Sequence, residues 1–213
     1  VEEGYLGALD KFADELQAAG ATVIRDRLPR IDSEAHFTLY LKLLGAALAA
    51  SMSDTEVEEL LARFEGAPED VKRIGGMRAA GTALSHREWM RLDNARRTAR
   101  LAFDDFFGEI DLIIAPAASG PAFPKDEDGF RPFRRIEING KKQLETLELF
   151  WAGYSGVVGL PSVVGPMAQI GGLPVGYQAI AGHGRDHTAL AFARAVEREI
   201  GGFVPPPLVT GGA

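Results

Sequence analysis

The sequence of residues 151–182 is WAGYSGVVGLPSVVGPMAQIGGLPVGYQAIAG, and it contains two Gly-Leu-Pro steps, at 159–161 and at 172–174. Proline fixes its own φ and pushes the preceding residue towards extended geometry, so each step is expected to lead the chain into a strand. Gly171 and Gly172 tolerate positive φ, which suits a chain reversal between the two strands. The stretch therefore predicts an antiparallel β-hairpin.

The apolar residues of this hairpin follow one another instead of alternating strictly with polar residues. Continuous apolar runs are typical of strands that are buried on both faces. We therefore expect the hairpin to lie in the centre of a sheet. The residues concerned are Val163, Val164, Val175, Tyr177, Ala179 and Ile180.

The composition is that of an ordinary globular protein, with 213 residues, 46% hydrophobic and 25% charged. The formal net charge of −7 repels nucleic acid and anionic membranes unless the basic residues cluster. They do not cluster, because on the helix expected after Ser85 one pair of arginines lies nearly opposite another pair. The pairs are Arg87 with Arg91 and Arg96 with Arg100. We expect no nucleic-acid partner and no membrane partner.

The chain contains no cysteine, which excludes a disulfide framework, a cysteine-based zinc site and a cysteine nucleophile, and fits a cytoplasmic protein. The longest nearly apolar run, residues 43–52, has about half the length that a bilayer requires, so no membrane span is expected. The sequence starts at Val1 within an expected helix, without an initiator Met or a basic and apolar leader. We interpret it as a segment of a longer protein.

Helix signals dominate the first half of the chain. The clearest are two capping boxes, Ser53 with Glu56 and Ser85 with Glu88, which satisfy free N–H groups at a helix start. Because strands are interspersed with helices, we predict an α/β fold. The expected elements are a helix over 5–16, a strand over 22–24, a helix capped by Asp32 and running to 48, helices over 53–64, 71–81 and 86–108, a buried strand over 111–116, a helix over 144–154, the hairpin, and a final helix capped by Asp186.

The expected helix over 86–108 carries an apolar stripe about 100° wide that should face the core. Arg96 falls inside this stripe, and a buried guanidinium without a carboxylate partner is costly. We therefore expect a structural ion pair at Arg96, with the alternatives that Arg96 also helps to hold a substrate or orders a loop. The stripe consists of Trp89, Leu92, Ala99, Phe103, Phe106 and Phe107.

Two regions of the second half complete the prediction. Residues 117–142 contain several prolines and mixed charges, so we expect a long surface loop or arm there. The final helix should direct its apolar residues inwards. These are Leu190, Ala193, Val196 and Ile200.

Three local patterns have the residue types of functional sites without the spacing that these sites require. The run GHGRDH at 182–187 lacks the third glycine of a dinucleotide fingerprint and a following parallel strand. His183 and His187 do not share a helical face and have no third ligand nearby, which argues against a metal site. The run GYSGV at 153–157 resembles a nucleophile elbow around Ser155 but lacks its last glycine.

Lys42 lies among leucines, and a desolvated lysine is able to activate a serine nucleophile. The commoner outcome is a buried stem whose ammonium group reaches solvent. From the residues alone we therefore assign no catalytic residue, no metal and no cofactor.

Several segments, taken in order, resemble the C-terminal half of the amidase signature family. They are ALS at 83–85, DLIIAP at 111–116, GLPS at 159–162, GLPVGYQAI at 172–180, and Asp186 at the start of a helix. The GLPVGYQ segment is the most specific of them, and the matching segments extend over nearly the whole chain. The resemblance implies an α/β/α sandwich around a large mixed sheet, with residues 1–213 as the C-terminal segment of an amidase-type domain.

The resemblance also implies amide hydrolysis by a Ser, cis-Ser, Lys triad, with an oxyanion held by the N–H groups of a Gly/Ser-rich loop. Those residues belong to the N-terminal half of the family, and this chain has neither a GGSSGG loop nor a matching lysine. No catalytic residue is therefore carried over. Gly156 stands where the family often has Asn, and Ala115 where it often has Thr, which leaves the substrate class open.

In such enzymes the C-terminal half lines the acyl side of the pocket. This suggests an aromatic trio, Phe150, Trp151 and Tyr154, as substrate contacts, with Arg96 as a fourth candidate. Such a trio suits an apolar or aromatic amide. The alternative is that the three residues are plain core.

Two hypotheses for the function follow. In the first, the full-length parent hydrolyses the carbon–nitrogen bond of a small-molecule amide, and this chain supplies sheet and pocket wall while the missing N-terminal half supplies the nucleophile. In the second, the chain is a non-catalytic binding or scaffold module derived from the same fold. We expect the isolated chain to be inactive and to self-associate, because a sheet edge and apolar surface would be uncovered.

Overall fold

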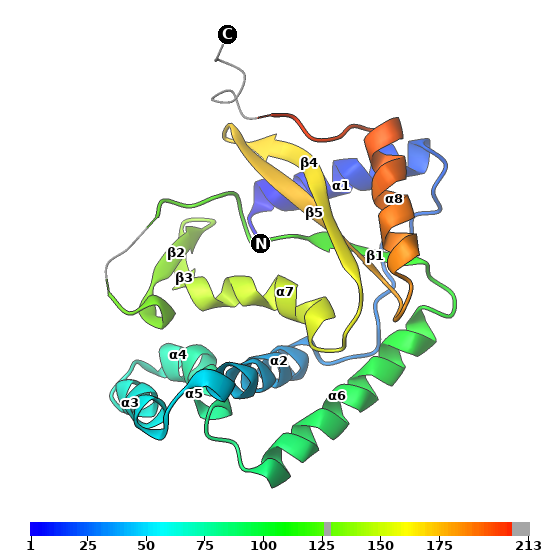
Figure 1. Ribbon diagram of the computed structural model, residues 1–213. Helices are drawn as coiled ribbons and strands as arrows, with labels where there is room; N and C mark the ends of the chain where they lie inside the picture. The colour runs from blue at the N-terminus through cyan, green and yellow to red at the C-terminus, as the bar shows by residue number, and fades with distance from the viewer. Residues whose placement is uncertain (126–128, 206–213) are drawn as a thin grey trace.

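The computed structural model describes residues 1–125 and 129–205 and combines helices with a small sheet, which confirms the α/β class (Figure 1). The helices are α1 (Glu3–Ala18), α2 (Ser33–Leu48), α3 (Asp54–Glu65), α4 (Glu69–Val71), α5 (Met77–Gly81), α6 (His86–Phe106), α7 (Leu149–Gly156) and α8 (Asp186–Glu199). The strands are β1 (Leu112–Pro116), β2 (Arg135–Ile138), β3 (Lys141–Leu144), β4 (Ser162–Ile170) and β5 (Leu173–Ala181). A π-helical turn over Lys72–Gly76 joins α4 to α5.

Both predicted capping boxes are present. The Ser53 side chain accepts a hydrogen bond from the N–H of Glu56, and the Glu56 carboxylate accepts one from the N–H of Ser53 at 2.7 Å. Ser85 and Glu88 form the same reciprocal pair at the start of α6. Asp32 caps α2 as expected. These three helix starts are therefore fixed by local chemistry.

Three strands form the main sheet in the order β1-β5-β4, and every pair is antiparallel. Gly171 and Gly172 have φ values of 56° and 80°, which confirms the predicted reversal between β4 and β5. A mixed sheet contains both parallel and antiparallel strand pairs. All pairs among the described strands are antiparallel, so these strands do not show the parallel pairing expected of a mixed sheet.

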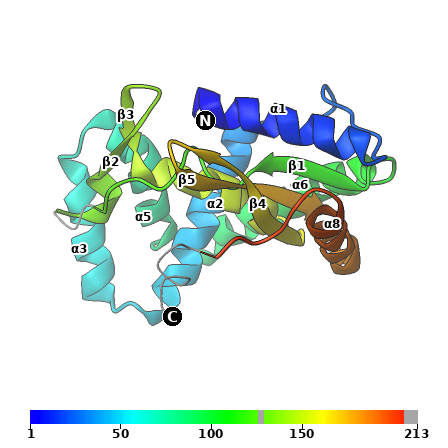
Figure 2. The same cartoon turned by 90° about the horizontal axis from the view of Figure 1, so that it is seen from above.

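Helices cover both faces of this sheet, in agreement with an α/β/α layering. On one face Phe12 of α1 stacks on Tyr177 of β5, and Val196 of α8 joins the same cluster. Figure 2 shows α1 running alongside the strands. On the other face Phe103 of α6 packs in one cluster with Ile180 of β5.

The expectation that both strands of the hairpin are central is right for β5 and wrong for β4. Residues 177–181 of β5 are all buried, whereas the burial of β4 alternates and Val164 is 60% exposed. The reason is the position in the sheet. β5 has a neighbour on each side, and β4 has none on its outer side among the described residues.

A second core lies between α2, α3, α5 and the hairpin β2–β3. Phe37, Leu41, Phe64 and Leu144 are buried in it. This hairpin corrects part of the loop expected over 117–142. Residues 135–144 form two paired strands, 117–125 contain no helix or strand, and 126–128 lie outside the described residues.

Other details differ from the sequence prediction. Residues 22–24 form no strand, and Asp186 is the first residue of α8 instead of its cap. Leu190 is exposed because α8 buries Ala189 and Val196, and Trp89 is exposed near the start of α6. Among the helices that the structure describes, none combines the length and the apolar character needed to cross a membrane.

Candidate functional site

The aromatic trio lies on α7, which packs against α2. Gly153 allows this contact, since a Cβ atom there would overlap the ring of Tyr40. Phe150 meets Phe37 of α2 edge to face, with ring centroids 5.5 Å apart, and meets Trp151 in the same manner at 5.0 Å. Such edge-to-face pairs favour a fixed ring orientation.

Phe150 is the member of the trio that lines a small cavity. This cavity has a volume of about 230 Å³ and lies between α2, the 72–77 region and α7. An ion pair between Arg73 and Glu34, 3.3 Å apart, lies among its lining residues. The apolar wall consists of Phe37, Leu41, Ile74, Met77, Leu147 and Phe150. The size suits a small apolar group.

Tyr154 packs in a different place, against His36 of α2 and Phe103 of α6, with both centroid distances at 5.6 Å. Burial raises the pKa of the Tyr154 hydroxyl, so the residue stays protonated at neutral pH. The trio is joined through Phe150, whose ring centroid lies 5.0 Å from that of Trp151 and 6.0 Å from that of Tyr154, while Phe150 borders one core cluster and Tyr154 the other. The structure does not gather the three rings around one cavity.

His36 is a polar residue that the sequence analysis treated only as part of a helix. It is 4% exposed, and its Nε2 lies 3.0 Å from the carbonyl oxygen of Tyr154. Because a carbonyl only accepts hydrogen bonds, Nε2 carries the proton of the neutral ring, and Nδ1 is an acceptor. No described group bonds to Nδ1. Burial lowers the pKa of His36, and the bond to Tyr154 opposes this shift.

A larger cavity of about 890 Å³ lies between α2 and α6. Its floor and walls include His36, Leu39, Leu92, Ala95, Ala99 and Ala102. The three alanines are spaced along one side of α6 and leave the space open because their side chains are short. Lys42 and Asp32 also line it. Apolar walls with a few polar groups are typical of small-molecule sites.

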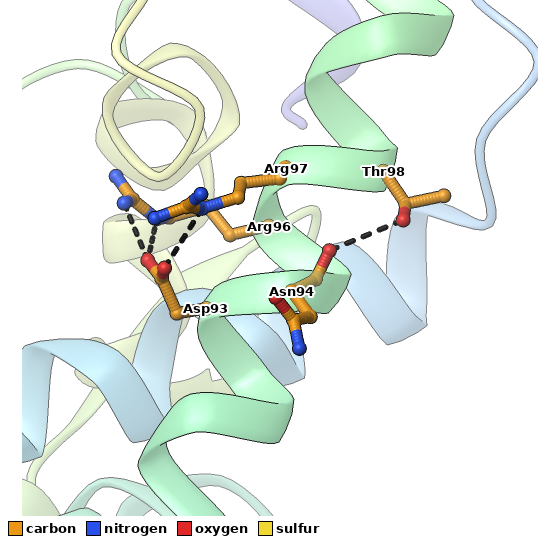
Figure 3. A network of polar contacts seen from close by, with 5 residues as sticks. All are labelled: Asp93, Asn94, Arg96, Arg97 and Thr98. Atoms are coloured by element: carbon orange, nitrogen blue, oxygen red, sulfur yellow. Dashed lines mark hydrogen bonds and ion pairs between the residues drawn. The ribbon is translucent and has the colours of Figure 1, made fainter.

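Arg96 has the carboxylate partner that the sequence analysis expected (Figure 3). Asp93 lies one turn earlier on α6, and Arg96 and Arg97 each place Nε 2.9 Å from one of its oxygens. The buried member is Asp93, at 3% side-chain exposure, whereas the Arg96 side chain is 39% exposed. The bond from Arg96, followed by that from Arg97, lowers the pKa of Asp93.

Asp93, Arg96 and Arg97 are not among the residues that line either of the two cavities described above. No hydrogen bond or ring contact among the described residues joins Arg96 to the aromatic trio. A substrate contact by Arg96 therefore stays a prediction, as it does for the trio.

Ser155 is buried in a polar cluster at the sheet. Gln178 Nε2 lies 3.2 Å from the hydroxyl oxygens of both Ser155 and Ser162, and the two hydroxyl oxygens are 3.4 Å apart. Gln178 Oε1 is buried without a partner among the described groups. No histidine or lysine bonds to Ser155 in the described part of the chain, so the geometry gives it a packing role. Sequence reasoning missed Gln178, although it stands in the most specific motif.

A comparison with family models matches the Amidase family over residues 1–190. The indoleacetamide hydrolase of Bradyrhizobium japonicum is 27% identical over 203 residues, covering 94% of this chain and 40% of the relative. The glutamyl-tRNA(Gln) amidotransferase of Exiguobacterium sibiricum has one subunit that is 26% identical, covering 98% of this chain and 44% of that protein. The chain thus spans about two fifths of the length of these relatives.

Solved structures agree with the fold. An amidase crystal structure superposes with a TM-score of 0.67 at 23% identity, covering 93% of this chain and 42% of that one. A bacterial aryl acylamidase of the amidase signature family gives a TM-score of 0.64 at 20% identity, covering 94% and 41%. The family match, the relatives and the layered fold agree with one another, and the chain belongs to the amidase signature family.

Proposed function

We propose that this chain is part of an amidase that hydrolyses the carbon–nitrogen bond of a small-molecule amide, and that another part of the protein supplies the nucleophile. The observation that carries the proposal is the family match over residues 1–190. Of the relatives described above, one is named as an amide hydrolase and the other as part of an amidotransferase.

The residues of this chain support the proposal that another part of the protein supplies the nucleophile. Its sequence contains no GGSSGG loop, and its best serine candidate, Ser155, is held by Gln178 and Ser162 instead of by a base. A serine without an activating base is a weak nucleophile. In this proposal the chain contributes sheet strands and the wall of the substrate pocket.

The proposed substrate is an apolar or aromatic amide. One matched relative is named for indoleacetamide, and one structural neighbour is an aryl acylamidase. Phe150 and the other apolar residues of the 230 Å³ cavity offer a surface of the corresponding chemistry. The absence of cysteine suits a protein of the cytoplasm, which we include in the proposal.

The test measures ammonia release from two primary amides, indoleacetamide and an aryl carboxamide. The 213-residue chain alone should release none, and the chain combined with the portion of the B. japonicum hydrolase outside the match should release it. Turnover by the chain alone, with contaminating hydrolases excluded, would falsify the assignment of the nucleophile to another part, whether or not it survives Ser155→Ala and Lys42→Ala. Binding of the amide without turnover in the combined sample would favour a non-catalytic module instead.

The proposal also includes self-association of the chain when it is alone. Among the described residues β4 has no neighbour on its outer side and Val164 on it is exposed, and an uncovered strand edge favours pairing with another chain. Light scattering at micromolar concentration should therefore show particles larger than a monomer. A monodisperse monomer would argue against uncovered interface on this chain.

A further inference from the structure

The cavity of about 890 Å³ between α2 and α6 has no role in the proposed function. One wall of it is apolar and consists of Leu92, Ala95 and Ala99, which share a face of α6, together with Leu39 of α2. Leu39 is buried, and Leu92 and Ala99 pack against its core cluster, so the fold holds this wall in place. An apolar cavity of about 150 Å³ is enough for benzene, so this one has room for an aromatic ring with a side chain.

Lys42 brings a positive charge to this apolar wall. It is half-buried, lines the cavity and lies one helical turn beyond Leu39 on α2. Among the described residues, no hydrogen bond or ion pair joins its side chain to a carboxylate. The pKa of Glu88 is lowered mainly by bonds from the hydroxyl and N–H of Ser85, and only slightly by Lys42. Lys42 therefore lies at the cavity without a carboxylate bonded to it.

The acidic residues that line the cavity lie towards its other end and have partners of their own. Asp32 caps α2, accepts two N–H bonds there, and lies about 15 Å from Lys42 along the axis at about 1.5 Å per residue. Glu34 is ion-paired with Arg73. Arg30 also lines that end, next to Asp32 in the chain. A small anion at the apolar wall would therefore meet Lys42 without a competing carboxylate.

The smaller cavity has a different charge pattern, which separates the two by the ligand that each suits. Its charged lining residues, Glu34 and Arg73, pair with each other at 3.3 Å. A neutral group fits such a cavity, whereas an apolar body with an anionic head fits the larger one. The two cavities have these different properties although Glu34 and Thr38 line both.

His36 adds a second polar position to the wall of the larger cavity. It is 4% exposed, and its Nδ1 accepts no hydrogen bond from the described groups. Buried acceptors ordinarily have a partner. An N–H group on a bound ring, or a water that the ligand holds in place, would supply the missing donor. The residue also reports on occupancy, because it lines this cavity and not the smaller one.

We propose that the cavity between α2 and α6 binds an aromatic carboxylate, with its ring against Leu92, Ala95 and Ala99 and its carboxylate at Lys42. A bond from an ammonium group to a carboxylate is stronger than one between neutral groups, and the apolar wall suits the ring. The site stands on the residues of the cavity alone. Its link to the reaction rests on the proposed function, because hydrolysis of an aromatic amide yields an acid of this class, and the bound molecule would then be the product.

The experiment follows the NMR signals of the His36 ring while the 213-residue chain is titrated with three probes. Indole-3-acetate carries a ring, an N–H group and a carboxylate, 1-naphthaleneacetate lacks the N–H group, and indole-3-acetamide lacks the charge. We expect both acetates to shift the His36 signals at millimolar concentration or below, and the amide to bind there at least tenfold more weakly. Equal affinity of acid and amide at this signal would overturn the proposed site.

Two pairs of variants locate the ligand. Lys42→Gln removes the charge at the apolar wall, and Arg30→Gln removes the same charge at the other end as the matched control. Ala95→Leu narrows the cavity from an exposed position of α6, and Asn94→Leu adds the same side chain at the next exposed position, outside the lining. Lys42→Gln and Ala95→Leu should each weaken binding of indole-3-acetate at least tenfold, and the two controls less than twofold. Circular dichroism checks that all four variants fold.

The remaining outcomes also decide the matter. No binding up to about 10 mM, or binding that either Lys42→Gln or Ala95→Leu leaves unchanged, would overturn the site. If the portion of the B. japonicum hydrolase outside the match displaces the acid, another segment covers the cavity and the proposed ligand is wrong. Binding that depends on Lys42 and persists in a combined sample without ammonia release would leave the site standing and contradict the proposed function.

Discussion

The strands β4 and β5 each begin at a Gly-Leu-Pro step of their own and each contain nine residues, yet they occupy different environments. β5 is enclosed by β1 and β4 and by helices on both faces, and its last five residues are buried. β4 alternates between exposed and half-buried residues. The comparison shows that a local motif selects a strand, while the neighbours of the strand in the sheet decide how much of it is covered.

The largest expected difference between the two strands is in core packing. Ile180→Ala in β5 should lower the free energy of unfolding by about 2–5 kcal/mol, because Ile180 is fully buried between α6 and the sheet. Val164→Ala in β4 should change it by less than about 0.5 kcal/mol, since that side chain is mostly exposed. Urea unfolding with an unchanged m-value is the measurement. Equal losses would show that β4 is covered in solution.

A second substitution tests the tight packing of Gly165 in β4. A Cβ atom at Gly165 would lie 2.5 Å from the hydroxyl oxygen of Tyr177, so Gly165→Ala should cost about 1–3 kcal/mol through overpacking. Gly7→Ala in α1 is the matched control, because no atom lies within 4 Å of its Cβ position. That control should stabilise the protein by about 0.5–1 kcal/mol. A neutral Gly165→Ala would mean that the two strands separate easily.

The smallest expected change in the free energy of unfolding at neutral pH comes from the protonation of His36, which lies in the helical layer that covers β5. Its pKa is below 6.5 in the folded protein because of burial, so the unfolded chain binds the proton more readily. Stability should be constant above about pH 6.5 and should decrease as the pH falls from there towards the folded pKa. Denaturant unfolding from pH 8 to pH 5 measures this slope.

The control for that pH series is His36→Gln, whose amide does not titrate and is able to donate to the carbonyl of Tyr154. The part of the slope that disappears in His36→Gln belongs to His36. An identical slope in both proteins would place the pH dependence in another group.

The parts of the fold that sequence reasoning predicted correctly depend on neighbours in the chain. The capping boxes at Ser53 and Ser85 bring together residues three positions apart, and the glycines at 171 and 172 act through their own φ angles. The hairpin β2–β3 was missed, although Asn139-Gly140 is a strong turn signal and both residues have positive φ. Prolines and charges around that dipeptide had favoured a loop.

The candidate site was less accessible to such reasoning. The apolar arc of α6 correctly indicated that Arg96 has a carboxylate partner, but it did not identify Asp93, which is buried by packing from outside the helix. His36 was overlooked because a histidine on a helix gives no signal until α6 and α7 close around it. The aromatic trio is adjacent in sequence and its rings are in contact through Phe150, yet Phe150 borders one core cluster and Tyr154 the other, which the sequence did not predict.

The sequence by itself determined three helix starts, at Asp32, Ser53 and Ser85, the β4–β5 reversal and the segments shared with the amidase signature family, because each depends on residues within a few positions of one another. Only the tertiary structure decided that β5 is enclosed and β4 is an edge, that His36 keeps an unsatisfied nitrogen, and that Ser155 is held by Gln178. Those outcomes depend on contacts between residues far apart in the chain. Their energy comes from burial and from hydrogen bonds that exist only once the layers have packed.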